Sequence, residues 1–122
     1  MSWDAGLDAL LSRMERAMDV ASRRQQLTAS NVANIDTPGY RTQDIDFDEA
    51  LRRAVRENEP AMTAAKAGTV RGLTTRNDGN DVSPDREMLA LAETRLRYET
   101  AAAVARLRLR QIRAALSEGR NG

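Results

Sequence analysis

Apolar side chains recur along the N-terminal third of the chain at alternating spacings of four and three residues. This heptad pattern predicts one helix whose apolar stripe lies along a single face, as in coiled coils. Only Gln25 and Thr28 interrupt the stripe with polar side chains. We expect the helix to cover residues 4–35, because Pro38 excludes the residue before it from the helical region. The apolar seam positions are Leu7, Leu11, Met14, Met18, Ala21, Val32 and Ile35.

The C-terminal third repeats this pattern with spacings of three and four residues. Ser83 followed by Pro84 is typical of a helix start and Gly119 is the expected stop, so we predict a helix over residues 84–118. Leucines outside the seam, at Leu89, Leu96 and Leu107, make more than one face of this helix apolar. The seam positions are Met88, Leu91, Tyr98, Ala102, Ala105, Leu109, Ile112 and Leu116, with Arg95 as the charged member.

The central segment, residues 36–82, follows a different pattern. Asp46 and Glu49 form a capping-box-like start for a short helix over residues 46–58. Residues 59–81 show no helical period, and their glycines indicate turns between short strands.

The chain is therefore predicted to be a single, mainly α domain over residues 1–122. Two long terminal heptad helices pack as a coiled coil, joined by a short helix and an irregular segment or small β-hairpin. The seams have two interpretations: an antiparallel hairpin within one chain, or a coiled-coil segment built for a polymer. Small residues in the second helix, Ala101, Ala102, Ala103 and Ala105, favour close packing in either case, so the seams alone leave both open.

Composition narrows the classes of function. The chain has neither cysteine nor histidine, which excludes disulfides and thiolate chemistry and removes the commonest general base and metal ligand. A net charge of +1 with interspersed signs argues against binding of nucleic acid. We expect a non-enzymatic protein without cofactor, metal ion or small-molecule substrate. With only one Trp, two Tyr and one Phe, its core needs completion against other subunits.

Two acidic clusters have the residue types of chemical sites. Asp44, Asp46 and Asp48 alternate before the short helix, and we interpret them as a solvated capping cluster rather than catalytic carboxylates. The acidic run over residues 78–81 does not have the ligand spacing of a calcium-binding EF-hand loop.

The most informative segment leads out of the first helix. Asn31 and Asn34 share a helix face just before a Thr-Pro-Gly-Tyr breaker, although asparagine disfavours helix interiors. We predict that Asn31, Asn34 and Tyr40 fix this turn. The signature positions are Ser30, Asn31, Ala33, Asn34, Thr37, Pro38, Gly39 and Tyr40.

This string resembles the signature of bacterial flagellar basal-body rod and hook proteins. The runs over residues 44–47 and 78–88 are most similar to the proximal-rod subunits of that family, and the similarity extends over residues 7–116. Hook and distal-rod members carry large inserted domains, for which this chain has no room.

The resemblance implies a structural subunit that polymerises through its terminal helices into the hollow rod, which transmits torque and carries exported subunits. Its partners would be other copies of itself, neighbouring rod subunits, the junction of the basal membrane ring with the export gate, and the flagellar type III export apparatus. Phe47 and Leu51 resemble a Phe-x-x-x-apolar motif read by the export gate, but the same spacing suits the apolar face of a short helix.

The resemblance also places the protein in the rod, in the periplasmic space. The first residues have neither a basic region nor an apolar core, so we expect export without a cleaved signal peptide. No apolar run is long enough to span a membrane. The alternative to a rod subunit is a cytoplasmic coiled-coil adaptor or export chaperone.

Overall fold

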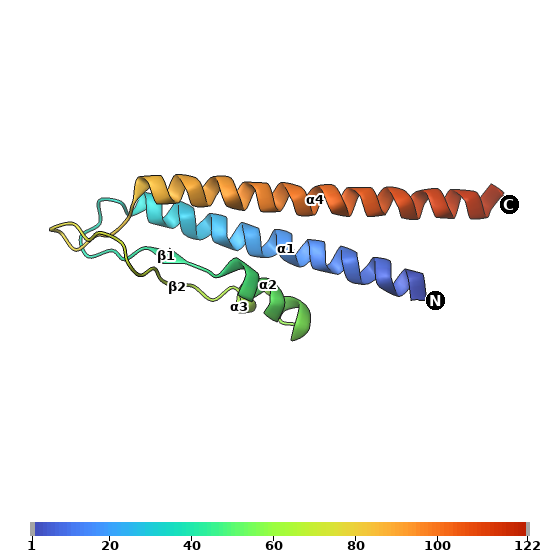
Figure 1. Cartoon of the computed structure of the whole chain (residues 1–122), viewed down its shortest axis with the longest axis horizontal. Coiled ribbons are helices and arrows are strands. Elements are labelled where there is room, and N and C mark those ends of the chain that lie inside the picture. The colour runs from blue at the N-terminus through green and yellow to red at the C-terminus, as the bar shows by residue number, and fades with distance from the viewer. Residues whose placement is uncertain (1, 122) are drawn as a thin grey trace.

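Two long helices dominate the fold. The computed structural model describes the backbone of residues 2–121 and the side chains of residues 6 and 9–120. Helix α1 (Ser2–Ala33) and helix α4 (Pro84–Asn121) lie side by side and run in opposite directions, so both chain ends lie at the same end of the molecule (Figure 1). The prediction of a mainly helical chain with long terminal helices is confirmed. The predicted seam residue Leu7 lies outside the described side chains.

The central segment folds back beside α1 (Figure 1). Strand β1 (Gln43–Asp44) pairs antiparallel with strand β2 (Gly68–Thr69), which confirms a small sheet in the middle of the chain. Along the sequence, helices α2 (Phe47–Arg56) and α3 (Ala61–Ala64) come between the two strands. The expectation of no helix within residues 59–81 is wrong, because α3 forms a single turn after Pro60, too short for any period to appear.

The predicted start of α4 is confirmed, whereas its predicted end is wrong. The Ser83 hydroxyl accepts a hydrogen bond from the Arg86 N–H at 3.3 Å, so Ser83 caps the helix as predicted. Gly119 does not stop the helix, which continues to Asn121. A glycine ends a helix when it takes a positive φ, and Gly119 is not among the glycines that do so.

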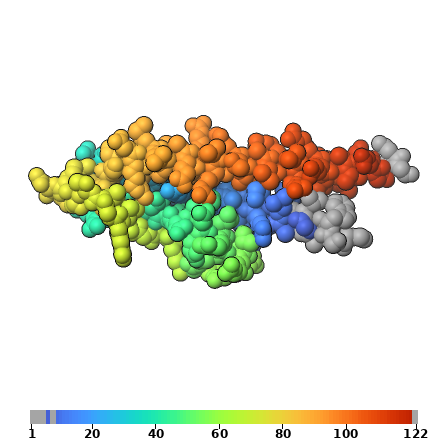
Figure 2. All heavy atoms as spheres, viewed as in Figure 1, coloured from blue at the N-terminus to red at the C-terminus, as the bar shows by residue number. Residues whose placement is uncertain are grey.

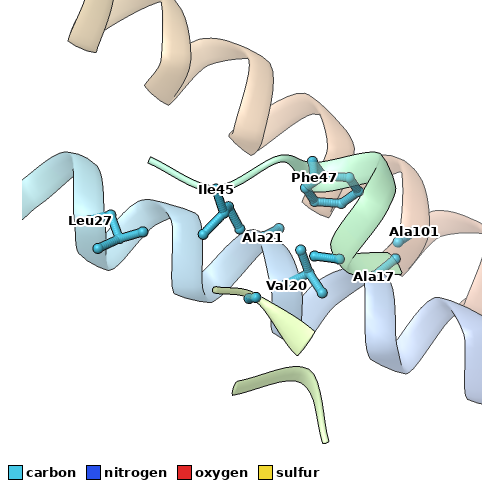
Figure 3. Packing of buried hydrophobic residues seen from close by; sticks show 9 residues of the cluster. Ala17, Val20, Ala21, Leu27, Ile45, Phe47 and Ala101 are labelled. Carbon is cyan, nitrogen blue, oxygen red and sulfur yellow. The ribbon is translucent and has the colours of Figure 1, made fainter. Parts of the chain in front are cut away.

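The apolar core is small and rich in alanine. Phe47 of α2 lies beside Ala17 of α1 and Ala101 of α4, while Ile45 packs over Val20 and Ala21 (Figure 3). Met14, Met18, Leu51 and Ala61 pack against this cluster without being fully buried. Small side chains allow the elements to approach closely, but they bury little apolar area per residue.

Helix α4 turns a different face to α1 from the one its heptad seam predicts. Its buried positions are Glu87, Ala90, Thr94 and Ala101. Each lies one residue before a predicted seam position, so the seam is rotated by about 100° from the contact with α1. The polar Glu87 occupies this inner face because it accepts a hydrogen bond from Asn31 of α1, whereas the buried Thr94 hydroxyl has no hydrogen-bond partner among the described residues. None of the described helices is long and apolar enough to cross a membrane.

Candidate assembly site: a polar hub and an exposed seam

Asn31 lies at the centre of a buried polar cluster near the end of α1. Its Nδ2 donates to the Gln43 carbonyl oxygen at 2.8 Å and to Glu87 Oε2 at 3.0 Å. Its Oδ1 accepts from the Tyr40 hydroxyl at 2.9 Å and from the Gln43 N–H at 3.0 Å. All four hydrogen-bonding positions of the amide are therefore used, and this one side chain ties α1 to the turn, to β1 and to α4.

The second asparagine of the signature, Asn34, holds the turn itself. Its Nδ2 donates to the Ser30 carbonyl oxygen at 2.8 Å, and its Oδ1 accepts from the Thr37 hydroxyl at 3.0 Å. Its carbonyl oxygen, at the end of α1, accepts from the Thr37 N–H at 3.0 Å and from Asn80 Nδ2 at 2.8 Å. The turn is thus closed by a residue from the far end of the central segment.

Asn80 is fully buried and was not predicted as a site residue. Besides Asn34, its Nδ2 reaches the Thr37 carbonyl oxygen at 2.9 Å, and its Oδ1 accepts from the Val82 N–H at 2.9 Å. Two segments of the chain lie close together here, because the Gly39 N–H donates to the Asp78 carbonyl oxygen at 2.8 Å. A β-carbon on Gly79 would lie 3.2 Å from the Gly39 Cα, so any other residue at position 79 would press against the neighbouring backbone.

Asp81 joins the two ends of the central segment. Its Oδ1 accepts from the Thr42 N–H at 2.6 Å and from the Thr42 hydroxyl at 2.8 Å, and its Oδ2 accepts from Arg41 Nε at 3.0 Å. Burial alone would raise the pKa of the Asp81 carboxyl, but the hydrogen bonds from Thr42 and Arg41 outweigh it and lower that pKa.

Asp44 of β1 lies between two arginines. Arg24 of α1 binds it in bidentate fashion, with Nε to Oδ1 at 3.0 Å and Nη2 to Oδ2 at 3.2 Å, while Arg86 Nη2 of α4 reaches Oδ2 at 2.6 Å. Burial would raise the pKa of the Asp44 carboxyl, but the two guanidinium groups and the Ile45 N–H lower it. Arg24 and Arg86 also bind Glu93 and Glu87, so the ion pairs form a network across α1, β1 and α4.

We call this cluster the polar hub. Its members share hydrogen bonds or ion pairs that join the helix pair to the central segment: Arg24, Asn31, Asn34, Tyr40, Thr42, Asp44, Asn80, Asp81, Arg86 and Glu87. Of the remaining signature residues, Ser30 lies 3.4 Å from the Tyr40 hydroxyl, and Ala33 and Pro38 are exposed.

The interpretation of three aspartates as one solvated capping cluster is wrong for Asp44 but holds for Asp46 and Asp48, which are exposed at the start of α2. Asp46 caps α2 by accepting from the Glu49 N–H at 3.1 Å. Asp44 belongs to the polar hub, and Asp48 pairs with Arg97 Nη1 at 3.1 Å. Among the described residues, no group of three His, Cys, Asp or Glu side chains is arranged to hold a metal ion.

The predicted seam of α4 lies on the surface. Leu91, Tyr98 and Leu109 are 43%, 42% and 43% exposed. Leu91 follows the buried Ala90 by one residue, and Tyr98 lies one heptad further along the helix. The same offset occurs on α1, where Val32 is 51% exposed beside the buried Asn31. Arg86 and Arg97 lie on the other side of α4 from these stripe residues, and there they pair with Asp44 and Asp48 of the central segment. The two half-exposed stripes therefore share the side of the helix pair that faces away from the central segment.

We call this surface the outer seam, formed by Met18 and Val32 of α1 and by Leu91, Tyr98, Ala102 and Leu109 of α4. Among the other predicted seam residues, Leu11, Met14, Ile35, Ala105 and Ile112 are half-buried. In Figure 2, α4 runs along the upper edge of the molecule, and the central segment bulges from the opposite side.

A second apolar stripe runs along α4. Leu89 and Leu96 are 70% and 65% exposed, and Leu107 is 48% exposed. They lie two residues before Leu91, Tyr98 and Leu109, so they point about 160° away from the outer seam. A helix that is apolar on several faces is typical of one buried in a larger assembly.

The two residues of the predicted export motif lie on α2. Phe47 is 7% exposed within the core, and Leu51 packs partly against it. In the folded chain they form the apolar face of a short helix.

Sequence reasoning singled out Asn31, Asn34 and Tyr40 but missed the buried ion pairs around them. One signal was available: Glu87, Ala90, Thr94, Arg97 and Ala101 repeat the spacing of three and four residues, one residue before the leucine seam. Because this second stripe is polar in part, it does not have the composition expected of an interior face.

Comparisons with known proteins identify the family of this chain. The family model described as "Flagella basal body rod protein" matches residues 11–41, which cover most of α1 and the whole signature turn. The chain is similar to the "Flagellar basal body rod protein FlgB" of Escherichia coli (strain K12), with 32% identity over 113 residues, 76% of this chain and 82% of the relative. The protein of the same name from Yersinia enterocolitica is 32% identical over 114 residues, 77% and 83% of the two chains. That from Cereibacter sphaeroides is 35% identical over 106 residues, again 77% and 83%.

These matches confirm the predicted class, a structural subunit of the flagellar basal-body rod that assembles with other rod proteins. Within that class, the chain belongs to the FlgB family.

Proposed function

We propose that this chain polymerises through α1 and α4, with the outer seam of each copy packed against the helices of neighbouring copies and neighbouring rod subunits. The product is the hollow proximal rod, which transmits torque and lets exported subunits pass. One observation carries the proposal: the heptad leucines of α4 are more than 40% exposed, although the heptad pattern is typical of helix contacts.

The energetics favour a partner on this surface. Fully burying a leucine or similar side chain contributes about 1.5–3 kcal/mol, and the half-exposed residues of the outer seam have used only part of this within one chain. Burying the rest of several such side chains along one helix face therefore favours association between copies.

We infer that the protein reaches the periplasmic space through the flagellar type III export apparatus, and that it lies at the junction of the basal membrane ring and the export gate. Phe47 and Leu51 are our candidates for the motif that the gate reads. Because Phe47 is 7% exposed in the folded chain, the gate would have to read it in an unfolded chain.

A charge in the outer seam tests the assembly surface. Ala102→Glu places a carboxylate in the outer seam, so we expect loss of rods and of swimming while export of the variant continues. Ala115→Glu is the matched control, because Ala115 is an exposed alanine of α4 outside both the outer seam and the stripe of Leu89 and Leu96. Swimming of the Ala102→Glu strain at the rate of the control would contradict the proposed surface.

A gene deletion separates the rod subunit from the adaptor. We expect an in-frame deletion to abolish swimming and to leave membrane rings without rods in electron micrographs, with both restored by complementation. Intact rods in the deletion strain, in the absence of a second copy of the gene, would instead favour the adaptor.

A further inference from the structure

A groove with an excess of positive charge lies between α1 and α2, the two helices that lie side by side in Figure 1. Its volume is about 540 Å³, and the half-buried side chains of Leu51 and Val55 form its apolar wall. We call it the basic groove, because three exposed arginines line it: Arg13, Arg52 and Arg56.

The arginines of the basic groove outnumber the carboxylates near it. Asp48, the carboxylate in its lining, already pairs with Arg97 at 3.1 Å. Arg52 pairs with Glu49 of its own helix at 2.7 Å, and its side chain is still 61% exposed. The other two arginines of the lining pair with none of the carboxylates whose side chains the structure describes. The basic groove therefore favours a negatively charged partner.

The far side of α1 carries the opposite charge. Glu15 and Asp19 are exposed, and neither pairs with any cation whose side chain the structure describes. The half-buried Arg16 beside them donates instead to the backbone of α2 and to the Asn58 side chain just after it. Arg23, one turn after Asp19, is half-buried and does not pair with it. The two carboxylates are thus available to another molecule.

The sequence extends this acidic face toward the start of α1. Asp8 lies one heptad before Glu15, and Asp4 lies four residues before Asp8, so the four positions fall within about 60° of one another on a helix. The half-buried Leu11, four residues before Glu15, gives this face an apolar border. We call the four positions the acidic stripe: Asp4, Asp8, Glu15 and Asp19.

The basic groove and the acidic stripe match in spacing as well as in charge. Arg52 and Arg56 are four residues apart on α2, as Glu15 and Asp19 are on α1. Each pair therefore spans about 6 Å along its helix. Two carboxylates can face two guanidinium groups when the helices lie side by side, and hydrogen bonds between such ionised groups are among the strongest in proteins.

A chain cannot place its own acidic stripe in its own basic groove. Arg13 lines the groove, and Glu15, two residues further along the same helix, points about 160° away from it. The two surfaces can meet only between different copies, and such a contact joins unlike surfaces. Repetition of a contact between unlike surfaces produces an open helical polymer unless the rotation closes a ring.

Building on the proposed assembly function, we propose that the basic groove of one copy binds the acidic stripe of a second copy. Arg52 and Arg56 face Glu15 and Asp19 of that copy, and its Leu11 packs against the apolar wall of the groove. The opposed charges fix the register of the two helices.

Cysteine cross-linking tests the contact in assembled rods, since the chain has no native cysteine. Val55→Cys marks the basic groove, while Ser12→Cys and Ser22→Cys mark the acidic face, one turn before Glu15 and one turn after Asp19. With a bifunctional thiol reagent on swimming cells, we expect a ladder of multimers when Val55→Cys is combined with Ser12→Cys, if the facing helices are antiparallel, or with Ser22→Cys, if they are parallel.

Each single cysteine variant should remain monomeric. Dimers from Ser12→Cys or Ser22→Cys alone would show that two acidic stripes face each other and would overturn the proposal. Swimming cells without a ladder from either pair would show that something other than a second copy occupies the groove. That result would overturn the proposed contact while leaving the rod function intact.

Charge reversal provides a second readout. Asp19→Arg and Arg56→Glu, each added to the cross-linking pair, should lower the yield of multimers about tenfold, because like charges then face each other. Combining the two reversals restores the opposite pairing, so we expect the yield to recover. Arg71→Glu is the matched control, because Arg71 is an exposed arginine of the central segment outside the basic groove. An equal loss in this control, or no recovery in the combined variant, would overturn the proposed pairing.

Discussion

The buried polar hub and the exposed faces of α4 differ in the kind of side chain that they contain. At the end where α1 meets the signature turn, the buried side chains are polar: Asn31, Asn80 and Asp81 are 1%, 0% and 2% exposed. Along α4 several large apolar side chains are exposed, with Leu89 at 70% and Leu96 at 65%. The chain thus uses directional hydrogen bonds for its own fold and leaves much of its large apolar surface for other molecules.

This division has a physical basis. An alanine-rich core holds elements together without specifying their angles, whereas a fully satisfied polar cluster tolerates only one arrangement. The polar hub therefore sets how α1, α4 and the central segment are oriented. The position of the outer seam follows from that orientation, so damage to the hub should appear in assembly as well as in stability.

The largest effect is expected at Asn31. Asn31→Ala leaves the Glu87 carboxylate, the Tyr40 hydroxyl and the Gln43 backbone with unmade hydrogen bonds in a buried place. At about 1–3 kcal/mol for each buried group without a partner, we expect a loss of about 3–5 kcal/mol. Urea unfolding of the purified protein, followed by circular dichroism, measures this loss.

Asn34→Ala is the matched control for this prediction. Asn34 is half-buried, and its side chain bonds only within the turn, to Ser30 and Thr37. We expect a loss of about 1 kcal/mol. Equal losses in the two variants would contradict the central role given to Asn31.

The next effect in size concerns pH. The pKa of Asp44 and of Asp81 is lowered in the folded chain, so the unfolded chain binds more protons as the pH falls toward the ordinary value of about 4. The stability that these carboxylates contribute is present above that value and is lost as the pH drops through the lower pKa of the folded state. We expect the urea midpoint to fall between about pH 5 and pH 3.

The double variant Asp44→Asn/Asp81→Asn is the control for this titration. It should be less stable than the wild type at pH 7, because Arg24, Arg86 and Arg41 lose their anionic partner. It should also lose less stability on acidification. An unchanged slope in this variant would assign the acid sensitivity to other carboxylates.

The contrast also explains what the sequence could predict. The heptad period and the helix-breaking residues were enough to predict the two long helices, because a stripe over four heptads and a Pro-Gly pair are local signals. The face that α4 turns to α1 was not predictable in this way. A leucine stripe shows that a helix packs against something, but it does not say whether the partner belongs to the same chain.

In the candidate site too, residues with a local sequence signal could be predicted and residues with distant partners could not. Asn31 could be found because an asparagine inside a helix is locally unfavourable and so needs a partner. Asp44 was misread because its partners, Arg24 and Arg86, are distant in the sequence. Asn80 looked like an ordinary turn residue, although its bonds close the end of α1 from the far end of the central segment.

The smallest predicted effect tests how tightly the polar end is built. Gly79 and Gly72 have nearly the same backbone, with φ of +83° and +81°, but only Gly79 lies against another segment, where a β-carbon would lie 3.2 Å from the Gly39 Cα. Gly72→Ala should therefore lower the free energy of unfolding by about 1 kcal/mol, because alanine disfavours the left-handed conformation. Gly79→Ala should cost about 2 kcal/mol, because the two segments beside the signature turn must also move apart. Equal urea midpoints for the two variants would mean that these segments move apart without cost, and the polar hub would then hold the turn less rigidly than its hydrogen bonds indicate.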